Sequence, residues 1–158
     1  LKTLIAYATK YGATEKAANK LASYLGENVE LVNLTKEKVN NLSDYDTVAI
    51  GGSIYMGKMR KEVNKFCAAN KEILKDQKLG LFICCGSSEA AEEQLNNSFA
   101  QELLEQAAAK GYFGYEYNLD KMNFLFRMII KKLAEVEESE SALKEDKIEE
   151  FAVQLTTD

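Results

Sequence analysis

The loop that follows the first apolar segment of the chain carries residues suited to holding an anion. The first turn of a helix has unpaired backbone N–H groups and the positive end of the helix dipole, which together bind a phosphate without a charged side chain. Thr9 and Thr14 would add hydroxyl donors, and Gly12 lacks the Cβ that would block a ligand. An ordinary strand-to-helix turn with Thr14 as its N-cap is the alternative. The loop reads Thr9-Lys10-Tyr11-Gly12-Ala13-Thr14, and an amphipathic helix is expected to start at its last residue.

Two later segments offer different chemistry. In the first, Tyr55 and Met56 present flat, polarisable surface for a ring, although packing or chance exposure is the alternative for this pair. Gly57 would let the backbone approach a ligand closely. The first segment reads Ser53-Ile54-Tyr55-Met56-Gly57-Lys58. The second supplies backbone N–H groups and small polar side chains but no aromatic ring, and it reads Cys85-Gly86-Ser87-Ser88-Glu89.

These three segments are predicted to meet at one site. Each follows an apolar strand, and a doubly wound parallel sheet binds its ligand beyond the carboxyl ends of its strands. A phosphate loop, a platform for a ring and a third polar wall favour a mononucleotide with an aromatic ring. A dinucleotide is disfavoured because the G-x-G-x-x-G fingerprint is missing, and the triphosphatase loop G-x-x-x-x-G-K-[ST] is missing too.

The residue types that are missing also limit the chemistry. The chain has no histidine, which removes the usual general base and most zinc sites. Three cysteines without histidine are poor ligands for a transition metal, so no protein-bound metal is expected. If the chain is a catalyst, a bound organic cofactor is expected to supply the reactive group.

Length and composition indicate one globular domain spanning residues 1–158. The net charge of −5 argues against a nucleic-acid partner, because no general basic field would attract a phosphate backbone. We find no charged-then-apolar leader and no apolar run near the ~20 residues of a membrane span. The cysteines form no disulfide framework, since they are odd in number and two are adjacent. The expected location is the cytoplasm.

Strands and helices are predicted to alternate along the chain, which implies an α/β fold with parallel strands and right-handed crossovers. We expect a doubly wound three-layer sandwich with a five-stranded sheet of order 2-1-3-4-5. Helical stripes follow the strands: a helix from Thr14 to Gly26, a weak helix near 39–42, a helix near 63–67, one long helix over 91–107 and a last helix near 148–155. The predicted strands span residues 4–8, 29–34, 47–51, 79–85 and 112–119.

Residues 120–140 do not fit this alternation and form an insertion between the fifth strand and the last helix. Its first part is apolar nearly all round, with basic residues interspersed, and an acidic stretch over 135–140 follows. One interpretation is a helix or long loop whose apolar side chains, Phe124, Phe126, Met128 and Ile130, pack on the domain. The other is a docking surface over residues 121–133 for a partner, an apolar substrate or a membrane, which would add peripheral membrane contact to the cytoplasmic location.

The first part of the chain resembles the flavodoxin signature at its spacing, although Ala6 stands where a larger residue is usual. The resemblance extends over nearly the whole chain. It implies a flavodoxin-like fold that binds FMN, with the phosphate held by residues 9–14 and the isoalloxazine between residues 53–58 and 85–87. The matching residues are Ile5, Tyr7, Thr9, Gly12, Thr14, Ala18 and Leu21.

Within that superfamily, three segments resemble the flavodoxin-type protoporphyrinogen IX dehydrogenases of bacteria, although Lys58 stands where that subfamily tends to have histidine. This resemblance implies a porphyrinogen substrate and a quinone that accepts the electrons. Electron-carrier flavodoxins commonly cover both faces of the flavin with aromatic rings, whereas this chain has no tryptophan and no aromatic residue over 84–95. The segments are 52–57, 123–133 and 147–152.

Two classes of function therefore remain open. The first is an FMN oxidoreductase that takes electrons from a flat apolar substrate, which the apolar and basic segment 121–133 favours. The second is a carrier that shuttles single electrons between redox partner proteins, which the acidic balance favours because negative surface attracts positively charged partners. Cys84 and Cys85 are expected to be small apolar residues at a strand end, with a redox role for Cys85 as the alternative.

Overall fold

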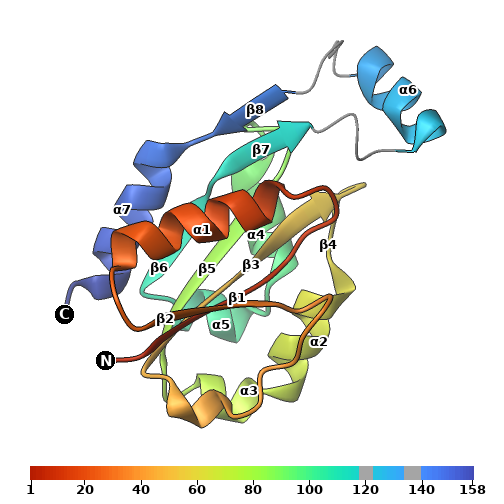
Figure 1. Cartoon of the computed structure of the whole chain (residues 1–158). Coiled ribbons are helices and arrows are strands. Elements are labelled where there is room, and N and C mark those ends of the chain that lie inside the picture. The colour runs from red at the N-terminus through yellow and green to blue at the C-terminus, as the bar shows by residue number, and fades with distance from the viewer. Residues whose placement is uncertain (118–122, 134–139) are drawn as a thin grey trace.

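A parallel sheet forms the centre of the protein in the computed structural model, which describes residues 1–117, 123–133 and 140–158 (Figure 1). Its strands lie in the order β2-β1-β3-β5-β6, and the short β4 pairs antiparallel with the end of β3. The parallel strands thus have the predicted 2-1-3-4-5 arrangement, with β4 as an addition. The strands are β1 (Thr3–Ala8), β2 (Val29–Asn33), β3 (Thr47–Tyr55), β4 (Lys58–Met59), β5 (Lys78–Cys84) and β6 (Ala109–Tyr112).

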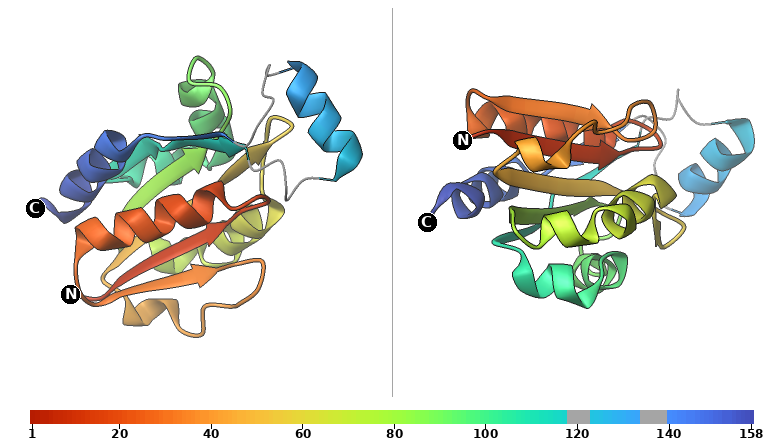
Figure 2. Two further views of the ribbon diagram at one scale, coloured as in Figure 1. Left: turned by 45° about the horizontal axis from the view of Figure 1, so that its top comes forward. Right: turned by 90° about the horizontal axis from the view of Figure 1, so that it is seen from below.

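Helices cover both faces of the sheet, which gives the three-layer sandwich (Figures 1 and 2). On one face lie α1 (Ala13–Leu25) and α7 (Glu145–Thr156). The other face is covered by α2 (Lys61–Ala69), α3 (Lys71–Leu74), α4 (Ala91–Ser98) and α5 (Gln101–Gln106). Two hydrophobic clusters, one on each side of the sheet, follow from this arrangement.

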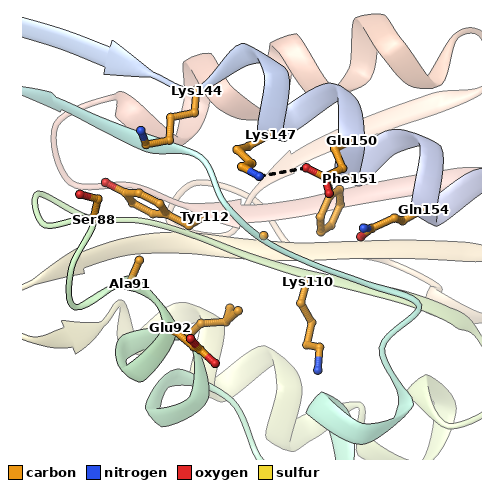
Figure 3. A pocket seen from close by; sticks show the side chains of 12 residues that line it. Ser88, Ala91, Glu92, Lys110, Tyr112, Lys144, Lys147, Glu150, Phe151 and Gln154 are labelled. Carbon is orange, nitrogen blue, oxygen red and sulfur yellow. Dashed lines mark hydrogen bonds and ion pairs between the residues drawn. The ribbon is translucent and has the colours of Figure 1, made fainter.

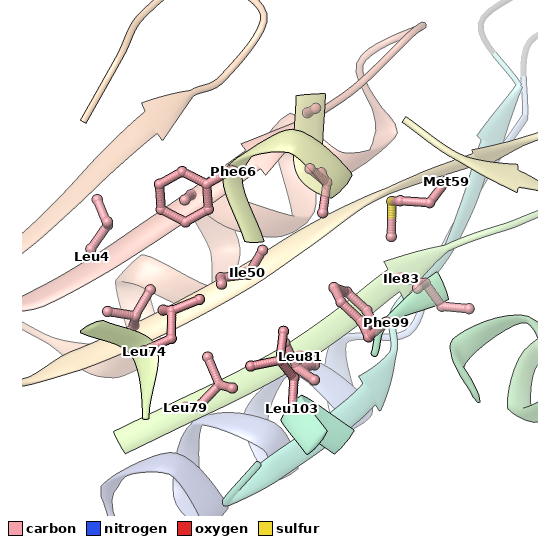
Figure 4. Packing of buried hydrophobic residues seen from close by; sticks show 14 of the residues in the cluster. Leu4, Ile50, Met59, Phe66, Leu74, Leu79, Leu81, Ile83, Phe99 and Leu103 are labelled. Carbon is pink, nitrogen blue, oxygen red and sulfur yellow. The ribbon is translucent and has the colours of Figure 1, made fainter. Parts of the chain in front are cut away.

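The strands alternate between the two clusters because successive side chains of a strand point to opposite faces. Along β1, Leu4 and Ala6 contact the cluster under α2 to α5, whereas Ile5 and Tyr7 contact the cluster under α1 and α7. Figure 4 shows the first cluster, in which residues from β3 and β5 meet residues from the helices, Ile50, Leu79, Leu81, Phe66, Leu74 and Leu103 among them. Burial on both faces explains why these strands read as continuous apolar runs.

The fifth parallel strand lies earlier in the sequence than predicted. It spans Ala109–Tyr112, whereas 112–119 was expected. The Phe113 ring is fully buried and stacks on Phe82 with centroids 4.7 Å apart. The Phe113 N–H still donates to the Ile83 carbonyl of β5 over 3.0 Å, and the next residue, Gly114, has a positive φ of +89°. The regular strand therefore ends where Gly114 takes a left-handed conformation. The following β7 (Gly114–Tyr117) instead pairs antiparallel with β8 (Glu140–Leu143), and this pair was not predicted.

Three helix predictions also need correction. The predicted long helix over 91–107 is two helices, because Phe99 is extended (φ −130°, ψ 151°) and turns its side chain into the core. The weak helix near 39–42 is only a 3-10 turn over Leu42–Asp44. The first helix begins at Ala13 with Gly12 as its N-cap, so Thr14 lies inside the helix and is not the cap.

The segment over 121–133 contains a helix, α6 (Phe124–Leu133). Phe124 and Met128 are exposed, so the expectation that they pack on the domain is wrong. The side chains of Phe126 and Ile130, together with residues 118–122 and 134–139, lie outside the part that the structure describes. In Figures 1 and 2, α6 stands away from the sandwich, at the end where the parallel strands have their carboxyl ends.

Candidate functional site

The phosphate loop is a compact turn between β1 and α1. The Gly12 N–H donates to Thr9 Oγ1 over 3.0 Å, and this hydrogen bond joins the start of the loop to the residue before the helix. Gly12 has φ +99°, a left-handed conformation that a residue with a Cβ adopts only with strain. Ala13 and Thr14 are the first residues of the helix, so their backbone N–H groups have no partner within α1. The loop therefore presents amide donors and a positive helix end to a ligand.

Thr14 contributes a buried hydroxyl that makes only a weak interaction within the described part of the chain. Its side chain is fully buried, and its Oγ1 has no hydrogen-bond partner of ordinary geometry among the described residues. The Cys84 thiol, a weak hydrogen-bonding group, is near enough to interact with it. Leaving a buried hydroxyl without a firm partner costs stability. A bound phosphate oxygen would satisfy this hydroxyl, so the residue fits the group that FMN would place there.

The ring segment over 53–58 is a β-hairpin, where a simple loop was expected. Ser53 to Tyr55 extend β3, Lys58 begins β4, and Tyr55 pairs with Lys58 across the turn. Met56 and Gly57 make the two-residue turn, and both have positive φ (51° and 75°), as a tight hairpin requires. The hairpin places Met56 at an exposed tip. Ser53 Oγ is buried and has no hydrogen-bond partner among the residues that the structure describes.

Aromatic and cationic side chains connect the phosphate loop to the hairpin. The rings of Tyr11 and Tyr55 meet edge to face with centroids 6.5 Å apart. The Lys10 ammonium stands 3.5 Å from the centroid of the Tyr55 ring, which makes a cation–π contact. A flavin that stacks on this face of Tyr55 must displace Lys10, whereas the opposite face requires no such movement.

The third loop has small side chains and no ring. Gly86, Ser87, Ser88 and Glu89 are all exposed. The loop is anchored at its start, since the Cys85 N–H donates to the Gly114 carbonyl over 3.0 Å and the Tyr112 hydroxyl donates to the Cys85 carbonyl over 3.1 Å. A ligand ring beside this loop would meet backbone, hydroxyl and carboxylate groups but no aromatic side chain of the loop.

The two adjacent thiols behave as buried apolar groups. Burial raises the pKa of the Cys84 thiol to about 12, against a weaker opposing effect of the Thr14 hydroxyl. Burial also raises the pKa of Cys85, whose thiol donates to the Ser87 carbonyl over 3.3 Å. Thiolates are the reactive form of cysteine. Both thiols stay protonated near neutral pH, which favours the structural interpretation of these residues over a redox role.

The structure brings the three predicted segments together. Ala8 pairs with Gly52, and Ser53 pairs with Cys84, so the ends of β1, β3 and β5 lie side by side. The Tyr11–Tyr55 contact joins the first segment to the second, and the Thr14–Cys84 interaction joins the first segment to the end of β5, directly before the third. The roles assigned to the individual residues remain predictions.

Sequence reasoning missed two residues at this site. Arg60 lies three positions after the hairpin turn pair and influences Tyr11: burial raises the pKa of the Tyr11 phenol, and the Arg60 guanidinium opposes that rise. Its guanidinium forms a partly buried ion pair with Glu62 at 3.6 Å. Tyr112 holds the third loop through its hydroxyl. Arg60 follows Lys58 and Met59 of the hairpin, so its place at the site could have been predicted from the sequence only if the hairpin itself had been predicted.

A separate groove runs along the free edge of β6, between α4 and α7 (Figure 3). Its volume is about 530 Å³, and Ser88 and Tyr112 form one end of it. Lys147 and Glu150 pair across 3.1 Å on its α7 wall. The groove contains no residue of the phosphate loop or of the hairpin, but it adjoins the third loop of the predicted cofactor site at Ser88. No group of three or more potential metal ligands occurs among the residues that the structure describes.

Comparison with known proteins gives the family. Residues 4–144 match the Flavodoxin domain family. An uncharacterized protein of Methanocaldococcus jannaschii is 30% identical over 113 residues, which cover 71% of this chain and 69% of that protein. Flavodoxin 1 of Bacillus cereus superposes with a TM-score of 0.60 at 18% identity, covering 98% of this chain and 97% of the other. The flavodoxin of Streptococcus pneumoniae TIGR4 gives 0.56 at 16%, with the same coverages.

The two solved structures show only that the fold is shared, whereas the match to the family over residues 4–144 shows that the chain is a member of that family. The buried Thr14 hydroxyl, which has no firm partner among the described residues, and the amide-lined turn at Gly12 fit the phosphate of FMN, the cofactor of this fold family. The chain belongs to the Flavodoxin domain family, and FMN is the cofactor that its site fits.

Proposed function

We propose that this protein is an FMN-dependent oxidoreductase of the protoporphyrinogen IX dehydrogenase type, which oxidises a flat apolar substrate and passes the electrons to a quinone. The observation that carries the proposal is the open third wall of the site. Gly86, Ser87 and Ser88 are exposed and carry no ring, so one face of an isoalloxazine beside them would be accessible to a second flat molecule.

The chain's own residues would bind and orient the cofactor. Thr9, Thr14 and the first amides of α1 would hold the phosphate, and Tyr55 would lie against the ring. FMN, when bound, supplies the transfer of electrons and hydride that no side chain of this histidine-free protein offers. Each turnover would move two electrons and two protons from the substrate to the quinone.

A single-electron carrier is the second candidate, because the net charge of −5 favours docking to positively charged redox proteins. The flavodoxin family itself is consistent with either role. The two candidates differ in whether the protein converts a small molecule by itself.

The deciding experiment is an anaerobic assay of the FMN-loaded protein with protoporphyrinogen IX and a quinone, run beside a reduction assay with a ferredoxin partner. The proposal expects porphyrin fluorescence to appear with quinone present and to stay absent without FMN. Electron transfer to the partner protein with no porphyrin formed would favour the carrier and overturn the dehydrogenase proposal.

A further inference from the structure

The exposed apolar side chains of this protein gather at one end of the molecule. Among the described residues, nine large apolar side chains are exposed, and four of them are on α6. A fifth, Met56, is 76% exposed at the hairpin tip. Single exposed apolar residues are ordinary, whereas a contiguous group marks an interaction site. The four on α6 are Phe124 (74%), Leu125 (71%), Met128 (54%) and Ile129 (41%).

These four residues form one continuous face of α6. At 3.6 residues per turn they cover an arc of about 140°. Lys132 is exposed and falls inside the same arc. A surface helix of a globular protein normally turns its apolar stripe toward the core. Here an apolar face is exposed, and the helix stands apart from the sandwich (Figure 2).

Two segments at this end of the molecule are basic, although the protein as a whole is acidic. Residues 54–61 and 121–133 together contain seven of the 20 basic residues and no acidic one. All 25 acidic residues therefore lie elsewhere in the sequence. Figures 1 and 2 place the hairpin and α6 at the same end, where the strands of the sheet end. An apolar face flanked by lysines is typical of a helix that lies in a membrane interface.

We infer that this end of the protein docks peripherally on an anionic lipid bilayer, with the exposed face of α6 inserted at the boundary between headgroups and acyl chains. Lys61 and Lys132 meet the lipid phosphates, while the acidic remainder of the molecule faces the water. No helix among the described residues is long and apolar enough to cross a membrane. The proposed contact is therefore that of a helix, α6, lying on the surface of the bilayer.

Charge decides between a bilayer and a second copy of the chain as the occupant. A dimer through this end would bring two sets of basic residues together with no acidic residue in either segment, and juxtaposed like charges oppose association. An anionic bilayer is complementary both to the lysines and to the apolar face.

The test is co-sedimentation of the full chain with vesicles of phosphatidylcholine alone and of phosphatidylcholine with phosphatidylglycerol in equal parts. We expect binding to the anionic vesicles that weakens as salt is added, and much weaker binding to the neutral ones. Leu125→Glu/Met128→Glu should lower partitioning at least ~tenfold. Lys61→Gln/Lys132→Gln should lower it about fivefold for each lysine.

Matched controls lie on other surfaces of the molecule. Ile73→Glu/Val153→Glu changes two exposed apolar residues of α3 and α7, and Lys65→Gln/Lys110→Gln removes two lysines outside the basic segments. Both pairs should bind vesicles as the wild-type protein does. Circular dichroism and FMN titration check that each variant is folded, which keeps loss of binding separate from loss of structure.

Absence of binding to both vesicle types would overturn the inference, and so would equal binding by the α6 variant and its control. A dimer in solution that the α6 variant abolishes, without vesicle binding by the wild type, would assign this face to a second copy. Vesicle binding does not depend on FMN or on turnover, so its failure and the failure of the proposed function are separately visible.

Discussion

We expect the buried hydroxyl of Thr14 to contribute to FMN binding and to contribute little to the stability of the protein without ligand. Thr14→Val keeps the shape of the side chain and removes Oγ1, which has no firm partner in the described part of the chain. We expect unchanged or higher stability without ligand, because a poorly satisfied buried hydroxyl is removed. FMN affinity should fall by about 1.5–3 kcal/mol, the value of a hydrogen bond to a charged group, and riboflavin affinity should change little.

Titration of flavin fluorescence with the protein measures both affinities, and urea unfolding measures the stability. Thr156→Val is the matched control, since the Thr156 hydroxyl donates to a carbonyl within α7, away from the site. Equal losses of FMN and riboflavin affinity would show that Thr14 does not contact the phosphate.

Tyr55 is the residue expected to lie against the flavin ring. Tyr55→Ala should shift the flavin absorption bands and relieve quenching of flavin fluorescence, because a stacked phenol perturbs and quenches the ring. Ser88→Ala on the third loop should do much less. Wild-type spectra in both variants would mean that Tyr55 is not the platform. The Lys10–Tyr55 cation–π contact would then be the function of this ring.

At the scale of the element, α6 should be separable from cofactor binding. Its exposed face and its position outside the sandwich indicate that the core does not depend on it. Replacing residues 121–133 with a Gly/Ser linker should therefore leave FMN affinity within a few-fold, while porphyrinogen turnover or membrane recruitment is abolished. FMN titration, the porphyrin assay and vesicle co-sedimentation measure the three properties.

A second, milder variant distinguishes a functional role of this segment from a role in folding. Arg127→Gln/Lys131→Gln/Lys132→Gln spares the apolar stripe and changes only charge. If this variant stays folded with unchanged turnover and unchanged vesicle binding, the segment has no functional role of the kind we expect. Collapse of the linker variant alone would show that α6 supports the core after all.

At the scale of the whole molecule, the buried thiols predict a loss of stability in alkali. Burial raises the pKa of Cys84 and of Cys67 from 9.0 to about 12. The unfolded chain loses these protons first, so their contribution to stability is complete below about pH 9 and is lost as pH rises toward about 12. The free energy of unfolding should fall by about 1.4 kcal/mol per pH unit for each thiol in this range.

Urea unfolding under reducing conditions over a series of pH values measures this slope. Cys84→Ala removes one titrating group and should make the slope shallower, whereas Ser88→Ala should leave the slope unchanged. A slope that Cys84→Ala does not alter would mean that the thiol is ionised as easily in the folded protein as in the unfolded chain.

The sequence by itself determined the order of the parallel strands and the three segments of the site. Strands buried on both faces must be apolar throughout, and the first helix must present its apolar residues at spacings of three and four. The position of a segment after a strand then places it at the carboxyl edge of the sheet, whatever the details of its loop. The predicted site residues could therefore be named without coordinates.

Only the tertiary structure decided where elements end and how the segments are shaped. Phe113 packs on Phe82 and Phe151 in the core where β6 gives way to the bend at Gly114, and Phe99 interrupts the predicted long helix with its side chain in the core. Such contacts join residues far apart in the chain, so no local pattern encodes them. The outward apolar face of α6 belongs to the same class: periodicity shows that a helix is amphipathic, and only the packed structure shows which face the core leaves uncovered.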